Sequence, residues 1–372
     1  MIAERREAMH EFLHSAGWDA ATLSPLPGDA STRRYFRLFR NGHSAMLMDQ
    51  PQDAEAPQCP PGATPEQRHA LGYNAVARLA GADCGRFVAT AQFLRSQGLS
   101  APLIYAANVK LGFVLIEDLG DDLYANVLAG GEEDEQALYA AAIEALAKLH
   151  VEAAPPTLGD AKTLHAYDET ALLAETDLMT EWFMPAALGR PTAEEERQEH
   201  RALWREVLRP VLDSPPVFVH RDYHAQNLFW LPERAGAARV GMIDFQDAVA
   251  GVRGYDLISL LEDARRDVTA EVAEAMTQRY LDAMHETGVA VHAESFRAEA
   301  AIMAAQRNTK IAGIFARLYK RDGKPRYLSH LPRVWGYLER DLQHPVLRPL
   351  KAWYGRKIPA AVRRESRVGE LV

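Results

Sequence analysis

Three polar side chains, carried by two linked segments, have the types and the spacing that phosphoryl transfer requires. The segment Val217–Asn227 contains Asp222 and, five residues later, Asn227, and the segment 242–248 contains Asp244. An amide oxygen and a carboxylate together suit Mg²⁺, which prefers hard oxygen ligands and keeps several waters. A loop Asp followed by a metal-binding Asn and a second metal-binding Asp is the arrangement of kinase-type phosphoryl transfer. We therefore expect Asp222 to be the catalytic base, and Asn227 and Asp244 to hold Mg²⁺.

The residues around these side chains predict how the backbone positions them. Val217–Val219 is a short apolar run rich in β-branched residues, which predicts a buried strand that delivers Asp222 into a loop. Leu228–Leu231 and Arg239–Ile243 predict two further strands joined by a polar turn that contains glycine. A hairpin of this kind would bring Asp244 back beside the amide that follows the catalytic loop.

The two segments together resemble the signature of a known family. His-x-Asp-x-x-x-x-Asn at His220–Asn227, followed by Ile-Asp-Phe-x-Asp at Ile243–Asp247, resembles the motif pair of the aminoglycoside phosphotransferase and choline kinase family. The resemblance implies an α+β, two-lobed protein-kinase-like fold and ATP-dependent phosphorylation of a small molecule. It also implies a small β-rich lobe over residues 1–117 and a larger helical lobe over 118–350 with the catalytic hairpin and the acceptor site. Residues 351–372 are a basic tail, and we expect Lys351–Arg367 to be partly loose.

A zinc site is a competing interpretation of the same stretch. His220 and His224 are four residues apart, which is the spacing of two zinc ligands on a helix. The segment lacks the Glu of the H-E-x-x-H motif, however, and it is predicted to be strand and loop rather than helix. We therefore favour the kinase interpretation.

The stretch Leu26–Phe39 is predicted to be the hairpin that covers the nucleotide. A Gly-Asp turn precedes alternating residues, in which Phe36 and Leu38 share one face. With only one glycine available, the cover would come from Gly28, Ser31 and Thr32, with Arg33 nearby. The string Gly-Asp-Ala-Ser-x-Arg-Arg-Tyr-Phe-Arg-Leu, with Met-Asp-x-Pro after it, resembles one bacterial subgroup of the family. That subgroup phosphorylates the anomeric hydroxyl of N-acetylmuramate and N-acetylglucosamine in cell-wall recycling.

The next predicted strand, Ser44–Asp49, departs from the kinase pattern. Kinases place a lysine here to hold the α- and β-phosphates, but this strand contains none. Either Arg33, Arg34 or Arg37 replaces it, or ATP is held mainly through the metal and the backbone. A catalytically impaired nucleotide-binding protein therefore stays an alternative.

Two apolar strands, Leu103–Ala107 and Gly112–Ile116, precede an acidic linker that contains glycine. The resemblance implies that this linker is a hinge whose backbone, around Glu117 and Leu119, binds adenine. A plain connection from strand to helix would carry the same residues, so the side chains do not decide between the two.

The sequence contains less information about which residues bind the acceptor. His224 lies in the catalytic loop, and a polar cluster, Gln306–Lys310, interrupts an apolar helical pattern. The cluster would either face the acceptor or lie on a solvated face. An anionic muramate would need positive groups such as Arg307 or Lys310, whereas a cationic aminoglycoside or choline would need carboxylates or aromatic rings.

Composition limits the remaining classes. The 372 residues are 48% hydrophobic and 25% charged with a formal charge of −9, which argues against general nucleic-acid binding. Two cysteines cannot form a disulfide framework and favour a reducing compartment. No segment is typical of a signal peptide or a membrane span. We expect a cytoplasmic enzyme whose partners are ATP and an amino sugar, with no nucleic acid, membrane or obligate protein partner.

Overall fold

The computed structural model describes residues 2–27, 32–51, 55–131, 133–159 and 162–364. The chain divides into two compact units. The first unit comprises Met1–Leu149, Pro155–His165 and Ala225–Ala248, and the second comprises His150–Ala154, Ala166–His224 and Val249–Val372. This division into units does not test the predicted lobe boundary near residue 117, which stays a prediction.

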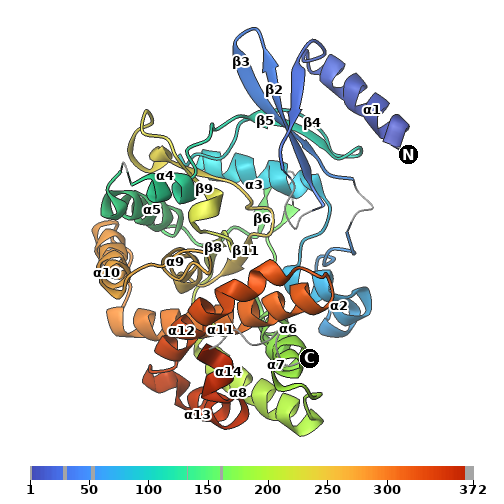
Figure 1. Cartoon of the computed structure of the whole chain (residues 1–372). Helices are drawn as coiled ribbons and strands as arrows, with labels where there is room; N and C mark the ends of the chain where they lie inside the picture. Colours follow the sequence, from blue (N-terminus) through green and yellow to red (C-terminus); the bar gives the residue numbers. More distant parts are fainter. Residues whose placement is uncertain (1, 28–31, 52–54, 132, 160–161, 365–372) are drawn as a thin grey trace. The chain divides into compact units, whose positions relative to one another are not determined.

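An antiparallel five-stranded sheet forms one end of the first unit (Figure 1). Its strands, in the spatial order β1-β2-β3-β5-β4, are β1 (Thr22–Pro25), β2 (Arg34–Arg40), β3 (His43–Asp49), β5 (Phe113–Glu117) and β4 (Ile104–Asn108). The helix α1 (Ile2–Ser15) packs on this sheet through Phe12 and Leu13, which join Leu38 and Leu47 in one buried cluster. Phe36 lies against the same cluster, so the predicted alternation along β2 is confirmed.

The rest of the first unit is helical, apart from two short hairpins. Its elements are α2 (Pro65–Leu71), the π-helix η2 (Asn74–Arg78), α3 (Cys84–Ser96), α4 (Tyr124–Gly130), α5 (Glu135–Leu149), β6 (Thr157–Leu158), β7 (Lys162–Thr163), η5 (Ala225–Asn227), β9 (Leu228–Trp230), η6 (Gly236–Arg239) and β10 (Val240–Met242). The helical segments α2 and η2 are separate because Gly72, at a φ of 96°, ends the first.

The second unit is built mainly of helices and contains one small two-stranded sheet. Its elements are α6 (Glu169–Leu178), η4 (Met179–Phe183), α7 (Met184–Leu188), α8 (Glu194–Leu212), β8 (Val217–Val219), β11 (Val249–Gly251), α9 (Gly254–Leu261), α10 (Ala270–Glu286), α11 (Ala293–Lys320), η7 (Pro325–His330), α12 (Leu331–Asp341), η8 (Pro345–Leu347), α13 (Arg348–Lys357) and α14 (Ala360–Arg364). The strand β8, predicted as buried, pairs antiparallel with β11.

The 28-residue helix α11 is the centre of this unit, and a glycine allows another helix to approach it closely. A Cβ atom at Gly313 would lie 2.5 Å from the backbone carbonyl carbon of Leu178, at the end of α6. No side chain fits at that distance, so the crossing of α6 and α11 depends on glycine at position 313.

Two expectations about the C-terminal part of the chain are wrong. Residues 351–357 were expected to be partly loose, but they lie in α13, which buries Trp353 and Tyr354. The polar cluster Gln306–Lys310 does not lie on a solvated face, because four of its five residues are at most 5% exposed. Among the described residues, no helix combines the length and the apolarity needed to cross a membrane.

Candidate active site

The hairpin of β9 and β10 positions the two predicted metal ligands in the first unit. Leu228 pairs with Met242, and one step further the N–H of Ile243 donates to the carbonyl oxygen of Asn227 (3.0 Å). The sequence-based prediction that the chain folds back here is therefore confirmed. Asp244 follows directly, with a φ of 61° and a side chain that is 41% exposed. An amide and a partly exposed carboxylate at one end of a hairpin form a hard oxygen set that fits Mg²⁺.

The side chain of Arg33 is paired with this carboxylate. Arg33 Nη1 lies 2.9 Å from Asp244 Oδ1, and Gln246 Nε2 donates to the same oxygen at 2.8 Å. The Arg33 side chain is only 4% exposed. Burial alone would lower the pKa of Arg33, but Tyr35 and the carboxylates of Asp244 and Asp247 outweigh this effect and raise the pKa above its ordinary value. The guanidinium therefore stays charged. A buried cation thus lies directly beside a predicted metal ligand.

The two other arginines proposed to replace the missing lysine are paired elsewhere in the first unit. Arg34 pairs with Asp49 at the open end of the β2–β3 hairpin, where β2 begins and β3 ends. Arg37 pairs with Asp118 (2.9 Å) and Asp121 (2.8 Å). Of the three candidates, Arg33 is therefore the one whose guanidinium contacts the motif carboxylate.

A second arginine, which sequence reasoning missed, holds the other motif carboxylate. Arg78, at the end of η2, bonds Asp247 through Nε (2.8 Å) and Glu55 through Nη1 (2.8 Å). Glu55 in turn accepts from the hydroxyl of Thr32 (2.9 Å). Nothing in the local pattern around Arg78 signalled this role, because its partners lie far away in the sequence.

The other predicted nucleotide contacts lie apart from this network or outside the described residues. Gly28 and Ser31 are outside the described residues. In the predicted hinge, the Glu117 N–H donates to the carbonyl oxygen of Leu103 (2.8 Å), and the Glu117 carboxylate accepts from Arg234 (2.5 Å). Leu119 is buried, with 8% of its surface exposed.

The catalytic loop belongs to the second unit, where a buried carboxylate fixes its backbone. Asp256 accepts hydrogen bonds from the N–H groups of His220 (2.6 Å) and Arg221 (2.8 Å). Arg221 has a φ of 82°, a conformation that non-glycine residues adopt only when their surroundings impose it. Asp222 follows and is partly exposed. Burial raises the pKa of Asp256 to about 7, although the two backbone bonds act to lower it.

A buried ion-pair cluster lies behind the loop, around Glu175 on α6. Glu175 accepts from Arg221 Nη2 (2.5 Å) and pairs with Lys310 Nζ (3.0 Å), and it also bonds the hydroxyl of Tyr167. Burial alone would raise the pKa of Glu175, but Lys310 and Arg221 lower it to about 2. The ammonium of Lys310 also donates to the hydroxyl of Tyr255 (3.1 Å). The predicted substrate residue Lys310 is therefore already neutralised by a protein carboxylate.

The other two predicted substrate residues are nearly buried in the same unit. His224 is 6% exposed and Arg307 is 5% exposed. Arg307 Nη1 donates to the carbonyl oxygen of Glu262 (3.2 Å). Burial lowers the pKa of His224, so its imidazole is neutral near pH 7. A neutral imidazole has one donor and one acceptor nitrogen and can bind a sugar hydroxyl.

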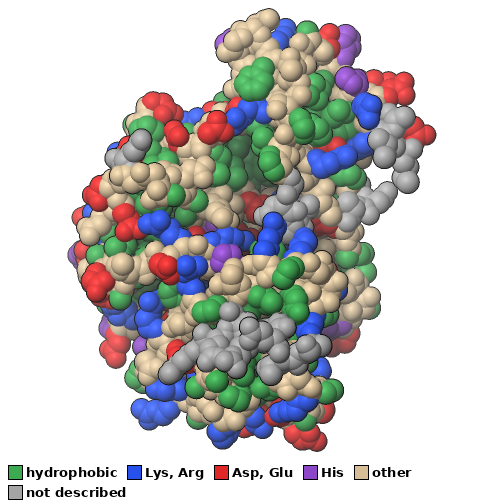
Figure 2. Space-filling model, in the orientation of Figure 1, with side chains coloured by type: hydrophobic (Ala, Val, Ile, Leu, Met, Phe, Trp, Pro, Cys, Tyr) green, Lys and Arg blue, Asp and Glu red, His purple; other side chains and the backbone are tan. Residues whose placement is uncertain are grey.

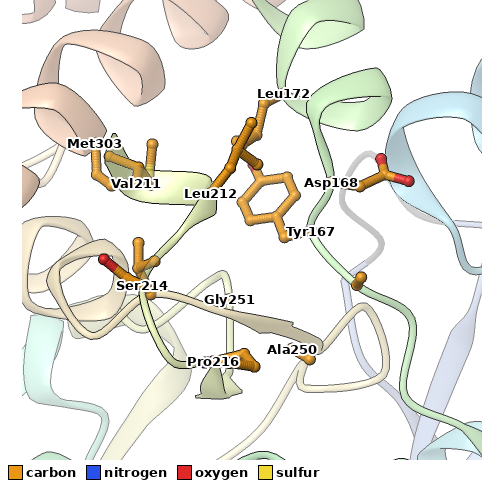
Figure 3. A pocket seen from close by; sticks show the side chains of 12 residues that line it. Tyr167, Asp168, Leu172, Val211, Leu212, Ser214, Pro216, Ala250, Gly251 and Met303 are labelled. Carbon is orange, nitrogen blue, oxygen red and sulfur yellow. The ribbon is translucent and has the colours of Figure 1, made fainter. Parts of the chain in front are cut away.

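A separate cavity of about 200 Å³ in the second unit is largely apolar (Figure 3). The ring of Tyr167 projects into it, and Leu212, Val211 and Met303 close one side. Asp168 lies at its edge, where its carboxylate caps α6 by accepting from the Ala171 N–H (2.9 Å). None of the predicted site residues is among the described residues that line this cavity, so it plays no part in the chemistry considered above.

Two observations, on surface charge and on possible metal ligands, bear on nucleic-acid binding and on the competing zinc site. Lys and Arg side chains are interspersed with Asp and Glu side chains over the face drawn in Figure 2. Within the part of the chain that the structure describes, His, Cys, Asp and Glu side chains form no group of three that could hold a metal ion. The buried ring of His220 packs edge-on against Tyr223.

Comparison with known proteins decides the family. The model of the phosphotransferase enzyme family matches residues 22–290. This chain belongs to that family. The matched range contains every predicted catalytic and nucleotide-binding residue, including those in the motif segments.

Similar family members extend over the full length of the chain. A protein of Caulobacter vibrioides named N-acetylmuramate/N-acetylglucosamine kinase is 44% identical over 375 residues, which covers 98% of this chain and 99% of that protein. A solved aminoglycoside phosphotransferase with bound ADP superimposes with a TM-score of 0.52 at 16% identity, covering 91% of this chain and 97% of its own. A choline/ethanolamine kinase family protein from Mesorhizobium loti gives 0.55 at 13% identity, covering 95% and 99%. The predicted kinase-like α+β fold is confirmed.

Proposed function

We propose that this phosphotransferase transfers the γ-phosphoryl group of ATP to the anomeric hydroxyl of N-acetylmuramate or N-acetylglucosamine. The observation that carries the proposal is the 44% identity to a kinase named for these two sugars, over nearly the whole of both chains. The bacterial subgroup signature from Gly28 to Leu38 is consistent with it.

In this proposal the catalytic loop acts on the acceptor. Asp222 orients the anomeric hydroxyl and accepts its proton as the oxygen attacks the phosphorus. An anomeric hydroxyl is more acidic than most alcohols, so an ordinary carboxylate suffices as the base. Asp256 keeps Asp222 in place indirectly, because it fixes the two preceding backbone N–H groups. His224 would contact a hydroxyl of the sugar.

The hairpin and Arg33 would act on the nucleotide. Asn227 and Asp244 would hold Mg²⁺, which when bound neutralises charge on the phosphates. Arg33 would take the place of the missing strand lysine, since its charge lies beside Asp244 and is protected from water. Thr32, with Gly28 and Ser31, would cover the phosphates, and the backbone of Glu117 and Leu119 would bind adenine. In this proposal Arg33 would supply the positive charge that a strand lysine supplies in other kinases, which counts against a catalytically impaired protein.

The test is ADP release from Mg·ATP with N-acetylmuramate, N-acetylglucosamine, kanamycin and choline supplied separately. We expect turnover with one or both amino sugars, together with loss of their reducing-end reactivity, because anomeric phosphorylation blocks that end. Asp222→Ala should lower kcat about 10²- to 10⁴-fold, the usual contribution of a general base. The matched control is Asp282→Ala, which removes an exposed carboxylate of α10 in the same unit.

Each outcome has a distinct meaning. Turnover only with kanamycin or choline would replace the proposed acceptor and leave the phosphotransferase chemistry intact. Turnover of an amino sugar that leaves its reducing end free would move the reaction to another hydroxyl. An Asp222→Ala variant as active as the Asp282→Ala control would refute the role of Asp222.

A further inference from the structure

Arg221, the residue before the catalytic base, holds a backbone conformation that its own type disfavours. Its φ of 82° lies in the left-handed region, where the Cβ atom of a non-glycine residue is crowded. Such a conformation persists only where the surrounding contacts impose it. The conformation of Arg221 sets the direction in which the chain enters Asp222, because the two residues share a peptide bond. The contacts that hold Arg221 therefore also bear on the carboxylate that follows.

Two kinds of contact act on Arg221, one on its backbone and one on its side chain. The backbone N–H donates to Asp256 Oδ1 (2.8 Å). The guanidinium reaches α6, where Nη2 donates to Glu175 Oε1 (2.5 Å), and its central carbon lies 4.8 Å from the ring centroid of Tyr167. The ion pair is almost fully buried, with 3% of the Arg221 side chain and 1% of the Glu175 side chain exposed. The side chain is thus tied to a helix that lies outside the catalytic loop.

Glu175 is itself held by several donors. Besides Arg221, it pairs with Lys310 Nζ (3.0 Å) and accepts from Gln306 Nε2 (2.9 Å), both on α11. The hydroxyl of Tyr167 donates a further hydrogen bond to it. A buried carboxylate with four donors is fixed in place, and hydrogen bonds to a charged group are the strong ones. The ion pair of the loop arginine therefore ends at a rigid point of the helical unit.

We propose that Arg221 is a positioning residue for the catalytic base, because its buried anchor at Glu175 holds residue 221 in the left-handed conformation that orients Asp222 toward the acceptor. This inference rests on the role of Asp222 in the proposed function and deepens it. Asp256 restrains the loop through backbone N–H groups, whereas the anchor restrains it through a side chain, so the two restraints are independent. Glycine would adopt the same φ with less strain, but it would adopt many other conformations as well. The anchored arginine holds one.

Three substitutions at position 221 separate the anchor from the backbone conformation. Arg221→Ala removes the anchor and keeps the Cβ atom, Arg221→Gly removes both, and Arg221→Lys keeps the charge without the planar guanidinium fork. The matched control is Arg201→Ala, because Arg201 lies on α8 and pairs with Asp177, two residues after Glu175 on α6. We expect all four variants to fold, since Glu175 keeps its pairing with Lys310, and urea denaturation checks this.

The kinetic readout is kcat against KM for ATP and for whichever acceptor the wild-type protein turns over. We expect Arg221→Ala to lower kcat about 10- to 100-fold and to change both KM values by less than about threefold, because a positioning residue contacts neither substrate. Arg221→Gly should be at least about threefold more active than Arg221→Ala, since glycine adopts a positive φ readily. Arg221→Lys should also recover part of the loss, and Arg201→Ala should match wild type.

A double variant tests whether the effect passes through the catalytic base. In an Asp222→Ala background, Arg221→Ala should lower kcat by less than about threefold, because the group that it positions is already absent. Losses that multiply in full would mean that Arg221 acts on something other than Asp222, and would overturn the inference.

Other results would also overturn it. An Arg221→Ala variant with the kcat of the Arg201→Ala control would mean that the backbone bonds to Asp256 fix the loop alone. A raised KM with unchanged kcat would make Arg221 a binding residue. Arg221→Gly as active as wild type would make the anchor dispensable, and Arg221→Gly less active than Arg221→Ala would make the arginine a packing residue. Full activity of Asp222→Ala alone would instead refute the proposed function, so the two failures are distinguishable.

Discussion

Replacing Arg33 by methionine is the most direct test of how this family member works without the strand lysine. The side chain is 4% exposed and its Nη1 lies 2.9 Å from Asp244. Methionine keeps most of the apolar contact but removes the charge. A hydrogen bond from a cation to a phosphate contributes about 1.5–3 kcal/mol, and about 1.4 kcal/mol corresponds to a factor of ten. We expect kcat/KM for ATP to fall about 10- to 150-fold.

The effect on stability should be much smaller. Asp244 is 41% exposed, so water can solvate its carboxylate once the arginine is gone. Such partly exposed pairs contribute about 1 kcal/mol or less, and the free energy of unfolding should fall by no more than about that amount. Urea denaturation measures the free energy of unfolding, and steady-state kinetics with saturating acceptor measure kcat/KM for ATP. The matched control is Arg34→Met, because Arg34 is the next residue but pairs with Asp49.

Three results would refute this reasoning. If Arg33→Met keeps its kcat/KM for ATP, the charge beside Asp244 does not act on the nucleotide. If Arg34→Met loses as much, the effect belongs to the hairpin as a whole. If the unfolding free energy of Arg33→Met falls by more than about 3 kcal/mol, Arg33 is a structural residue. Arg33→Lys should retain most of the activity, since lysine serves this purpose in other kinases.

Two further predictions concern buried carboxylates of the second unit. Asp256→Asn should lower the free energy of unfolding by about 1–3 kcal/mol and reduce kcat, because an amide cannot accept from both backbone N–H groups; an unchanged urea midpoint would contradict this. Asp341 is buried beside Glu262, and burial, with that carboxylate, raises its pKa well above the usual range. Its raised folded-state pKa adds stability that is fully present below pH of about 4 and is lost as pH rises through the folded-state pKa. Asp341→Asn should therefore gain stability relative to wild type as the pH of urea titrations rises above about 4, and a constant difference would argue against a protonated Asp341.

The parts of the site that the sequence predicted are those whose partners lie close along the chain. The hairpin that brings Asn227 and Asp244 together is set by two short apolar runs and the turn between them.

The residues that were missed have partners far away in the sequence. Glu175 is followed in α6 by Thr176 and Asp177, and an acidic residue in such a polar stretch suggests a solvated face. Its burial results from contacts with α11, more than a hundred residues later. The pairing of Arg78 with Asp247 spans 169 residues. Local patterns carry no information about such contacts. The order in residues 351–357 was missed for a similar reason, because two aromatic anchors among charged residues do not reveal the helix they pack against.

The glycine at the crossing of α6 and α11 has a consequence for how this fold can vary. Gly313 lies one helical turn beyond Lys310, and its contact Leu178 lies one turn beyond Glu175, so the close crossing and the ion pair are adjacent steps of one interface. A methyl group at position 313 would have to push the helices apart, and the ion pair would weaken because its energy falls with separation. A substitution at position 313 therefore also affects the ion pair of Glu175 and Lys310, near the catalytic loop. A lineage that replaced this glycine would also be under pressure to replace Glu175 or Lys310, because a weakened ion pair leaves buried charges close to the catalytic loop.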